Sequence, residues 1–200
     1  MQSDPLSGEG FSALRPVVAE LERLGVRYYI GGSVAGSAYG YSRMTQDVDV
    51  VADLRMEHVK PLVEALQQDY YVNAGTVADA VARRSCFNLI HNNTFYKIDI
   101  FASQYRDYNR AAFQRIRKKP LVNEDPTTEF FVASAEDVIL SKLEWYRLGD
   151  EASDRQWTDI LKILEVQKHL VDCNYMQKWA AELGVADILA KAWNEINNIQ

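Results

Sequence analysis

The sequence predicts an α/β (α+β) fold in which helices flank a mixed β-sheet and a C-terminal helical cap follows. Two observations predict this fold. Short β-type runs alternate with amphipathic helical segments over the first 132 residues. From Ser134 onward, apolar residues recur at helical spacing instead. The change of pattern predicts a flexible tail at residues 1–10, a sheet-containing core at 11–132 and a helical domain at 133–200.

The elements of the core follow from local patterns. Residues 1–10 are polar and carry proline and glycine, which is typical of a loose terminus. Gly25 ends the first helical run, and the turn Gly31-Gly32-Ser33 follows the first strand. The predicted helices are 11–24, 33–39 and 57–68, and the predicted strands are 26–30, 47–52, 85–90, 94–101, 114–122 and 129–132. A turn at residues 91–93 makes 85–101 a hairpin.

The cap begins at Ser134, whose hydroxyl is followed three residues later by Asp137, a helix N-terminal pattern. A break near Gly149 separates this helix from a second one that contains Trp157. One or two further helices are expected within residues 174–199. Trp145 and Trp157 are expected to hold the first two cap helices together.

The composition is that of an ordinary globular protein. The chain has 200 residues, of which 48% are hydrophobic and 25% charged, which suits one domain or a core with a small appendage. A net charge of −6 and a pI near 5.1 argue against non-specific nucleic-acid binding. Cys86 and Cys173 form no disulfide or zinc pattern. No long apolar run or signal-like N-terminus is present, so we expect a cytoplasmic protein without a membrane partner.

Three carboxylates carry the main chemical signal. Asp47 and Asp49 alternate with valine, so both side chains point to one face of a strand, roughly 6–7 Å apart. Asp99 stands in the apolar run Ile98-Asp99-Ile100, on a strand expected beside the first. Solvent-facing acids on an edge strand are the alternative for the pair alone. Three clustered carboxylates repel one another unless a cation lies among them, so the set predicts a divalent metal site, Mg²⁺ or Mn²⁺.

The turn Gly31-Gly32-Ser33 precedes the acid pair. Its glycines allow the backbone to approach a phosphate closely, and Ser33 offers a hydroxyl and an amide at a helix start. No Walker lysine accompanies it, so a P-loop ATPase is not indicated. A plain tight turn is the alternative. Together with the acids, the turn predicts a nucleoside triphosphate site.

The spacing of these residues resembles the DNA polymerase β-like nucleotidyltransferase superfamily. The matching pattern is Ile30-Gly31-Gly32-Ser33, then Asp47-Val48-Asp49, then Asp99. Residues 43–49 (Arg-Met-Thr-Gln-Asp-Val-Asp) are similar to the form found in a minimal bacterial branch, the AbiEii/AbiGii-type toxin nucleotidyltransferases. The resemblance implies a nucleotidyltransferase-type sheet and transfer of a nucleoside monophosphate from an NTP to an acceptor hydroxyl.

The resemblance also implies roles for individual residues. Asp47 and Asp49 would carry the metal ions, and Asp99 would ligate one ion and activate the acceptor. The nucleotide-binding residues it implies are Gly31, Gly32, Ser33, Arg43 and Lys142. Lys97 and Asp159 match further positions of the group, with no role assigned. The acceptor, an RNA or tRNA end, a protein or a small molecule, stays open, as do the identity of the NTP, the oligomeric state and a toxin–antitoxin partner.

Other functions remain in view. A basic segment, Arg110 to Lys119, could guide an RNA by phosphate contacts, or could protect an exposed sheet edge against aggregation. Tyr39 and Tyr41 could stack on a base, although packing is the more common role. A non-catalytic antitoxin-like or scaffold protein that retains the fold is the main alternative to an enzyme. A metal-dependent nuclease is disfavoured because the glycine turn suits a triphosphate.

Overall fold

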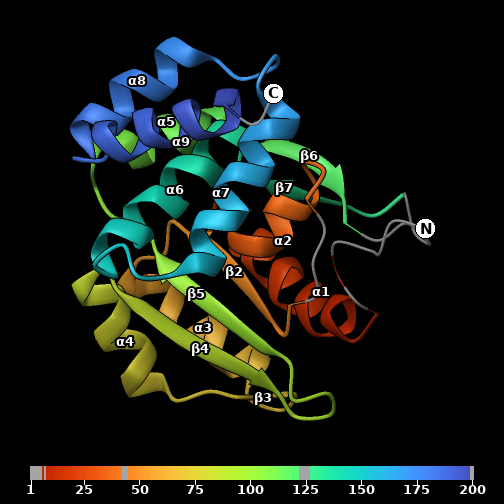
Figure 1. Cartoon of the computed structure of the whole chain (residues 1–200). Coiled ribbons are helices and arrows are strands. Elements are labelled where there is room, and N and C mark those ends of the chain that lie inside the picture. Colours follow the sequence, from red (N-terminus) through yellow and green to blue (C-terminus); the bar gives the residue numbers. More distant parts are fainter. Residues whose placement is uncertain (1–5, 7, 42–44, 122–126, 199–200) are drawn as a thin grey trace.

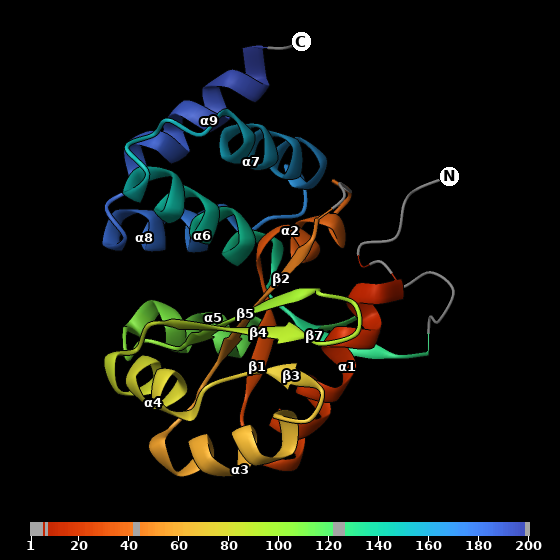
Figure 2. The same cartoon turned by 90° about the horizontal axis from the view of Figure 1, so that it is seen from below.

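A computed structural model describes residues 6, 8–41, 45–121 and 127–198. In this part of the chain, a single mixed sheet lies between two groups of helices (Figure 1). Figure 2 shows α1 and α3 beneath the sheet, and α2 and α6–α9 above it. The chain therefore has the predicted α/β architecture, with a helical cap on one face of the sheet.

The sheet has seven strands in the order β3-β4-β5-β2-β1-β7-β6. Their bounds are β1 Tyr28–Ile30, β2 Asp47–Ala52, β3 Tyr70–Tyr71, β4 Cys86–His91, β5 Lys97–Ala102, β6 Arg117–Pro120 and β7 Glu129–Val132. The pairs β2–β5 and β1–β7 are parallel, and the other four pairs are antiparallel. Strands β2 and β5 lie at the centre, where a side chain is shielded by neighbours on both sides.

The alternation along the two central strands separates a core face from a functional face. Val48, Val50 and Ala52 of β2 are fully buried, and Ile98 and Ile100 of β5 lie on the same face. The intervening residues are only partly buried. Period-2 alternation therefore places the carboxylates on the face opposite the main core contacts of these strands.

Described helices cover both faces of the sheet. They are α1 Gly8–Arg23, α2 Gly32–Ser37, α3 Met56–Leu66, α4 Ala74–Arg83, α5 Asp107–Arg115, α6 Ala135–Leu148, α7 Asp154–Gln167, α8 Cys173–Glu182 and α9 Ala186–Asn198. None of them is long and apolar enough to cross a membrane. Helices α6 to α9 correspond to the predicted cap, with two helices in the region where one or two were expected.

Two predictions about elements are corrected, and two elements of the structure were not predicted. Helix α1 begins at Gly8, and Leu6 is fully buried, so the predicted tail is wrong for these described residues; 1–5 and 7 lie outside them. Helix α4 was not predicted, although Val77, Ala80 and Val81 share one helical face. The strand predicted at 114–122 begins only at Arg117, because 107–115 form α5. Strand β3 was not predicted; it has only two residues.

The cap is joined to the core through α2, which has small residues where α7 crosses it. A Cβ built at Gly36 would lie 2.9 Å from Ile163 Cδ1, and one at Gly40 would lie 2.8 Å from Val166 Cγ1. The Gln167 side chain donates to the Tyr39 carbonyl at 2.9 Å. Helix α7 therefore packs at close range against α2 and against the residues that follow it, Tyr39 and Gly40.

The start of the cap is formed as the sequence predicts. The Ser134 hydroxyl accepts a hydrogen bond from the Asp137 backbone N–H at 3.2 Å. Trp157 of α7 stacks on Tyr146 of α6 at a centroid distance of 5.3 Å, as expected for a residue that holds these helices together. The expectation for Trp145 is wrong, because its ring is 51% exposed and meets Phe101 of the sheet edge-on.

Candidate active site

A row of polar side chains crosses three adjacent strands of the sheet and ends beside the glycine turn. Asp49 of β2 is in register with Asp99 of β5, which is in register with Asn88 of β4. On the other side of β2, the Gly31 N–H donates to the Asp49 carbonyl at 2.9 Å. Because registered residues on neighbouring strands point to the same face, the glycine turn and two of the predicted acids are brought together.

Asp47 lies two residues before Asp49 on β2, on the same face and beside Lys97. The two are in register, and the Lys97 ammonium lies 2.7 Å from Asp99 Oδ2 and 3.9 Å from Asp47 Oδ2. The Thr45 hydroxyl donates to Asp47 Oδ1 at 2.6 Å. The neighbouring carboxylates raise the pKa of Lys97, chiefly through the hydrogen bond with Asp99, so the lysine is fully charged. All three acids therefore lie on one face, with one ammonium between two of them.

Asn88 and Thr45 complete the surroundings of the acids. The Asn88 amide donates to Asp99 Oδ1, so both oxygens of this carboxylate have partners. The sequence analysis did not single out Asn88. Asn88 could have been found from the alternation in Cys86-Phe87-Asn88-Leu89, which places this residue on the same face of the predicted hairpin as Asp99.

The turn at Gly31-Gly32 brings α2 against Asp49. Gly32 has φ +56°, and a Cβ built on it would overlap the Asp49 carboxylate. Gly31 is extended at φ −114° and has open space where a Cβ would lie. Only Gly32 is therefore required on steric grounds, and its role is to let the acid approach the turn.

Replacing Gly32 with alanine is expected to destabilise the chain by about 3 kcal/mol, because backbone strain adds to overpacking against Asp49. Gly25 provides the matched control, since it has φ +67° and no neighbour within 4 Å of a built Cβ. Gly25→Ala should cost only about 1 kcal/mol from strain. Urea unfolding measures both. Equal losses for the two variants would show that Asp49 does not depend on a glycine at this point.

Asp49 has a perturbed pKa. Burial is the main cause, and the nearby Asp47 and Asp99 add to it, raising the pKa of Asp49 to about 6 from an ordinary 3.8. Lys142 and Lys97 act in the opposite direction. Since burial and like charge both disfavour the ionised form, a positive charge placed here would be stabilised.

The raised pKa predicts a pH dependence of stability in the metal-free chain. Between pH 3.8 and about 6 the folded state binds more protons than the unfolded state, so Asp49 makes stability fall as pH rises. The contribution is up to about 2–3 kcal/mol. Asp49→Asn should therefore gain stability relative to the parent chain by that amount between pH 4 and pH 7. Urea unfolding in chelator measures this; a pH-independent difference would contradict it.

Lys142 reaches the site from the cap. It is only 6% exposed, and its ammonium donates to Asp159 Oδ2 of α7 at 2.8 Å. Its charge also opposes the rise in the pKa of Asp49. The structure thus places Lys142 near the acids but held by Asp159. Arg43, the other predicted nucleotide contact from outside the turn, lies outside the described residues.

The basic segment is largely used within the fold. Arg110 pairs with Asp107, and Arg115 lies 2.8 Å from Glu136. Lys118 and Lys119 lie over the rings of Phe131 and Tyr39. Strand β6, which carries both lysines, is at the edge of the sheet. These contacts favour the protection of a sheet edge over a phosphate-binding patch.

The carboxylate set fits a divalent ion by its chemistry. Asp47, Asp49 and Asp99 are hard oxygen donors on one face, and magnesium prefers such ligands together with phosphates and water. In the described part of the chain, no three acidic, histidine or cysteine side chains are already gathered into a metal site. Binding an ion to all three would thus require them to close together, with displacement of Lys97 from Asp99.

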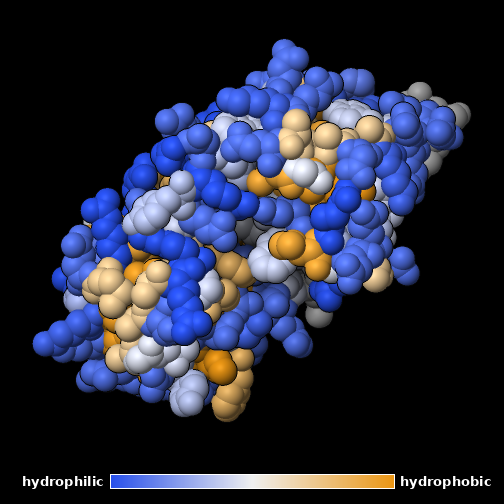
Figure 3. Space-filling model, turned by 90° about the vertical axis from the view of Figure 1, so that its left-hand side faces the viewer, coloured by the Kyte–Doolittle hydropathy of each residue, from blue (hydrophilic) through white to orange (hydrophobic). Residues whose placement is uncertain are grey.

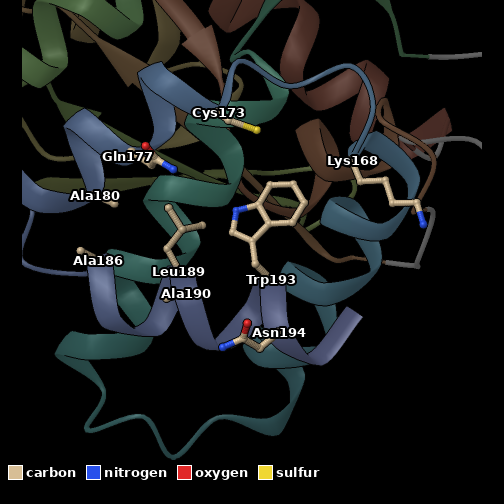
Figure 4. A pocket seen from close by; sticks show the side chains of 9 residues that line it. All are labelled: Lys168, Cys173, Gln177, Ala180, Ala186, Leu189, Ala190, Trp193 and Asn194. Atoms are coloured by element: carbon tan, nitrogen blue, oxygen red, sulfur yellow. The ribbon is translucent and has the colours of Figure 1, made fainter. Parts of the chain in front are cut away.

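A pocket elsewhere in the described residues lies within the cap. It has a volume of about 480 Å³ between the end of α7, α8 and α9, and Trp193, Cys173 and Gln177 contribute to its lining (Figure 4). None of the predicted site residues lines it. The surface in Figure 3 is mainly hydrophilic, with apolar side chains in separate patches. The carboxylate row, not this pocket, is therefore the candidate active site.

Several solved structures share the fold. The lincosamide antibiotic adenylyltransferase LnuA, bound to lincomycin, is 16% identical with a TM-score of 0.50, covering 82% of this chain and 99% of that one. An antigenic nucleotidyltransferase-like protein from Paracoccidioides brasiliensis is 17% identical with a TM-score of 0.52, covering 94% and 93%. The antibiotic-resistance factor ANT(2'')-Ia is 12% identical with a TM-score of 0.53, covering 92% and 96%.

No protein-family model and no curated protein matches the chain. At these identities the likeness concerns the fold alone, and it confirms the nucleotidyltransferase-type architecture that the motif predicted. Membership of the AbiEii-type branch stays a prediction.

Proposed function

We propose that this chain is a metal-dependent nucleotidyltransferase that moves a nucleoside monophosphate from an NTP to an acceptor hydroxyl and releases pyrophosphate. The observation that carries the proposal is the row Gly31, Asp49 and Asp99, in register across a nucleotidyltransferase-type sheet, with Asp47 beside it. Nothing in the packing of the fold needs three carboxylates on one half-buried face. A site for a cation and phosphates accounts for them.

The two ends of the row suit different substrates, the NTP at one end and the acceptor at the other. The turn Gly31-Gly32-Ser33 lies at the β1 side, where backbone amides suit the triphosphate. Asp99 lies one strand beyond Asp49, on the side away from the turn, and suits the acceptor. Lys142, near Asp49, and Arg43 are the cationic residues proposed for the phosphates. The predicted metal ion, Mg²⁺ or Mn²⁺, would be held by Asp47, Asp49 and Asp99, and would neutralise charge on the phosphates.

In the reaction, the acceptor oxygen attacks the α-phosphorus, and the bond from this phosphorus to the bridging oxygen of pyrophosphate breaks. Asp99 takes the proton of the acceptor hydroxyl. Asn88 holds one oxygen of Asp99, which fixes the orientation of the other. Because no covalent enzyme intermediate is needed, positioning and charge neutralisation supply the rate enhancement.

Among the acceptors left open by the sequence, we favour a small molecule. The net charge of −6 and the intramolecular contacts of Arg110, Arg115, Lys118 and Lys119 argue against a long RNA as the acceptor. LnuA, which shares the fold, is an adenylyltransferase of lincosamide antibiotics, and this is compatible with the choice. An RNA end or a protein is then an alternative outcome of the test, and a toxin–antitoxin partner remains part of the sequence-based hypothesis.

The test is incubation with each α-labelled NTP, Mg²⁺ or Mn²⁺, and three separate cell fractions: RNA, protein and small molecules. The control is the Asp47→Ala/Asp49→Ala variant, after circular dichroism has shown that it folds. We expect label in the small-molecule fraction only with the intact chain. Label in RNA or protein would support the proposed reaction but identify a different acceptor. No transfer in any fraction and no metal-dependent NTP binding by calorimetry would leave the scaffold alternative.

A further inference from the structure

Lys97 occupies a distinctive position in the candidate site. Its ammonium lies 2.7 Å from Asp99 Oδ2 and 3.9 Å from Asp47 Oδ2, and the amide of Asn88 donates to the other oxygen of Asp99. A divalent ion shared by Asp47 and Asp99 would need lone pairs that the ammonium now faces. The lysine and such an ion therefore compete for the same oxygens.

The two charged partners differ in how easily they move. The Asp99 side chain is 13% exposed and held by Asn88, whereas the Lys97 side chain is 43% exposed. Lysine has a long, flexible stem with a strongly hydrated ammonium. Lys97 can therefore turn to solvent while Asp99 stays in place, and displacement by a cation needs no rearrangement of the sheet.

The other lysine near the acids is less free to take this role. Lys142 is almost fully buried and is held by Asp159 at 2.8 Å. Its ammonium therefore stays on the cap side of the site, bound to an acid outside the row. Lys97 is the ammonium that the structure places against two of the three predicted metal ligands.

We propose that Lys97 is the internal counter-ion of the ligand-free site and competes with the divalent cation for Asp47 and Asp99. The inference rests on the proposed function, which supplies the cation. In the absence of nucleotide, metal binding is weak because the lysine must be displaced. When a triphosphate is bound, its oxygens offer the displaced ammonium a new partner, so metal and nucleotide bind more tightly together than either does alone.

The decisive experiment measures Mn²⁺ binding to the nucleotide-free chain, from the electron paramagnetic resonance signal of free Mn²⁺. Lys97→Met keeps much of the side-chain volume and removes the charge, so we expect it to bind Mn²⁺ at least about 10-fold more tightly than the parent chain. Lys97→Arg keeps the charge, so its Mn²⁺ binding should stay as weak as that of the parent chain. Lys60→Met, at an exposed position of α3, changes net charge equally and should have no effect.

A second readout uses stability. With chelator present, Lys97→Met leaves the acids without this counter-ion, and its melting temperature should fall by about 2–4 °C. Mn²⁺ should then raise the melting temperature of this variant more than that of the parent chain. If Lys97→Met does not fold, Lys97→Gln provides the same comparison.

The outcomes separate the two proposals. Mn²⁺ binding that is unchanged or weaker in Lys97→Met overturns the counter-ion role and leaves the proposed function standing. Absence of Mn²⁺ binding to every variant, with and without α,β-methylene-ATP, overturns the metal-dependent function and the counter-ion role together. Tighter binding in Lys60→Met of the same size would assign the effect to net charge and also overturn the inference.

Discussion

Asp99→Asn is expected to lower the rate of nucleotide transfer by roughly 10²–10⁴, the usual contribution of a general base. Asparagine has nearly the same shape and retains an oxygen for the Asn88 amide, so the strand should keep its register. What it loses is the basic oxygen that takes the acceptor proton, and one anionic metal ligand. Asp47, Asp49 and the glycine turn are untouched, so the NTP should still bind within a few-fold of its original affinity.

The separation of rate from affinity is what makes this variant informative. Single-turnover transfer gives the rate of the chemical step, and calorimetry with α,β-methylene-ATP gives nucleotide affinity. Asp53→Asn is the control, because Asp53 lies just after β2 and its side chain forms an ion pair with the exposed Arg27 at 3.3 Å. An unchanged single-turnover rate in Asp99→Asn would show that Asp99 does not take part in the chemical step. If the variant loses NTP binding as severely as it loses transfer, Asp99 acts in nucleotide binding instead.

Lys142→Met is expected to reduce the free energy of unfolding by about 3–5 kcal/mol, the cost of removing one partner of a buried ion pair. Lys142 and Asp159 are both almost fully buried, and their 2.8 Å contact joins α6 to α7. Without the ammonium, the Asp159 charge loses its lysine partner inside the cap. Urea unfolding at neutral pH measures the loss.

The double variant Lys142→Met/Asp159→Leu tests the cause. Replacing both charges with apolar groups should recover most of the stability, because the buried Asp159 charge is removed together with that of Lys142. Transfer should remain low, since Lys142 also acts on the phosphates in the proposed function. The exposed pair Lys162–Glu165 on α7 is the control, and Lys162→Met should cost less than about 1 kcal/mol. A double variant with full activity would make Lys142 a structural residue only.

The sequence was most informative where periodicity and spacing agree. Strands β2 and β7 have the bounds predicted for them. In β2 the alternation of aspartate and valine marks a half-buried strand clearly. The approach of Asp47, Asp49 and Asp99 was also predictable, since it needs only two adjacent strands with matching faces. The register that sets Asp49 opposite Asp99 was not, because pairing between distant strands depends on tertiary packing.

Other features depend on contacts that no local pattern contains. Helix α5 was not predicted, and its last two residues were assigned to a strand, because its arginines and glutamine hide the apolar face formed by Tyr108, Ala112 and Phe113. The environment of Lys97 arises from two strands, and that of Lys142 from two helices of the cap. Trp145 was assigned to the cap interior because a large aromatic residue is usually buried, whereas it lies half-exposed against Phe101.

The close packing of α7 on α2 has a consequence for how this chain could diversify. The sequence pattern changes near residue 133, which suggests a domain boundary there. Gly36 and Gly40 of the core nevertheless pack closely against Ile163 and Val166 of the cap. A cap taken from a relative would meet a surface fitted to another helix, directly behind the glycine turn. Recombination at the apparent domain boundary would thus disturb the site. A transferable module would have to include α2 together with the cap, and would leave the sheet with its acids as the separate inherited part.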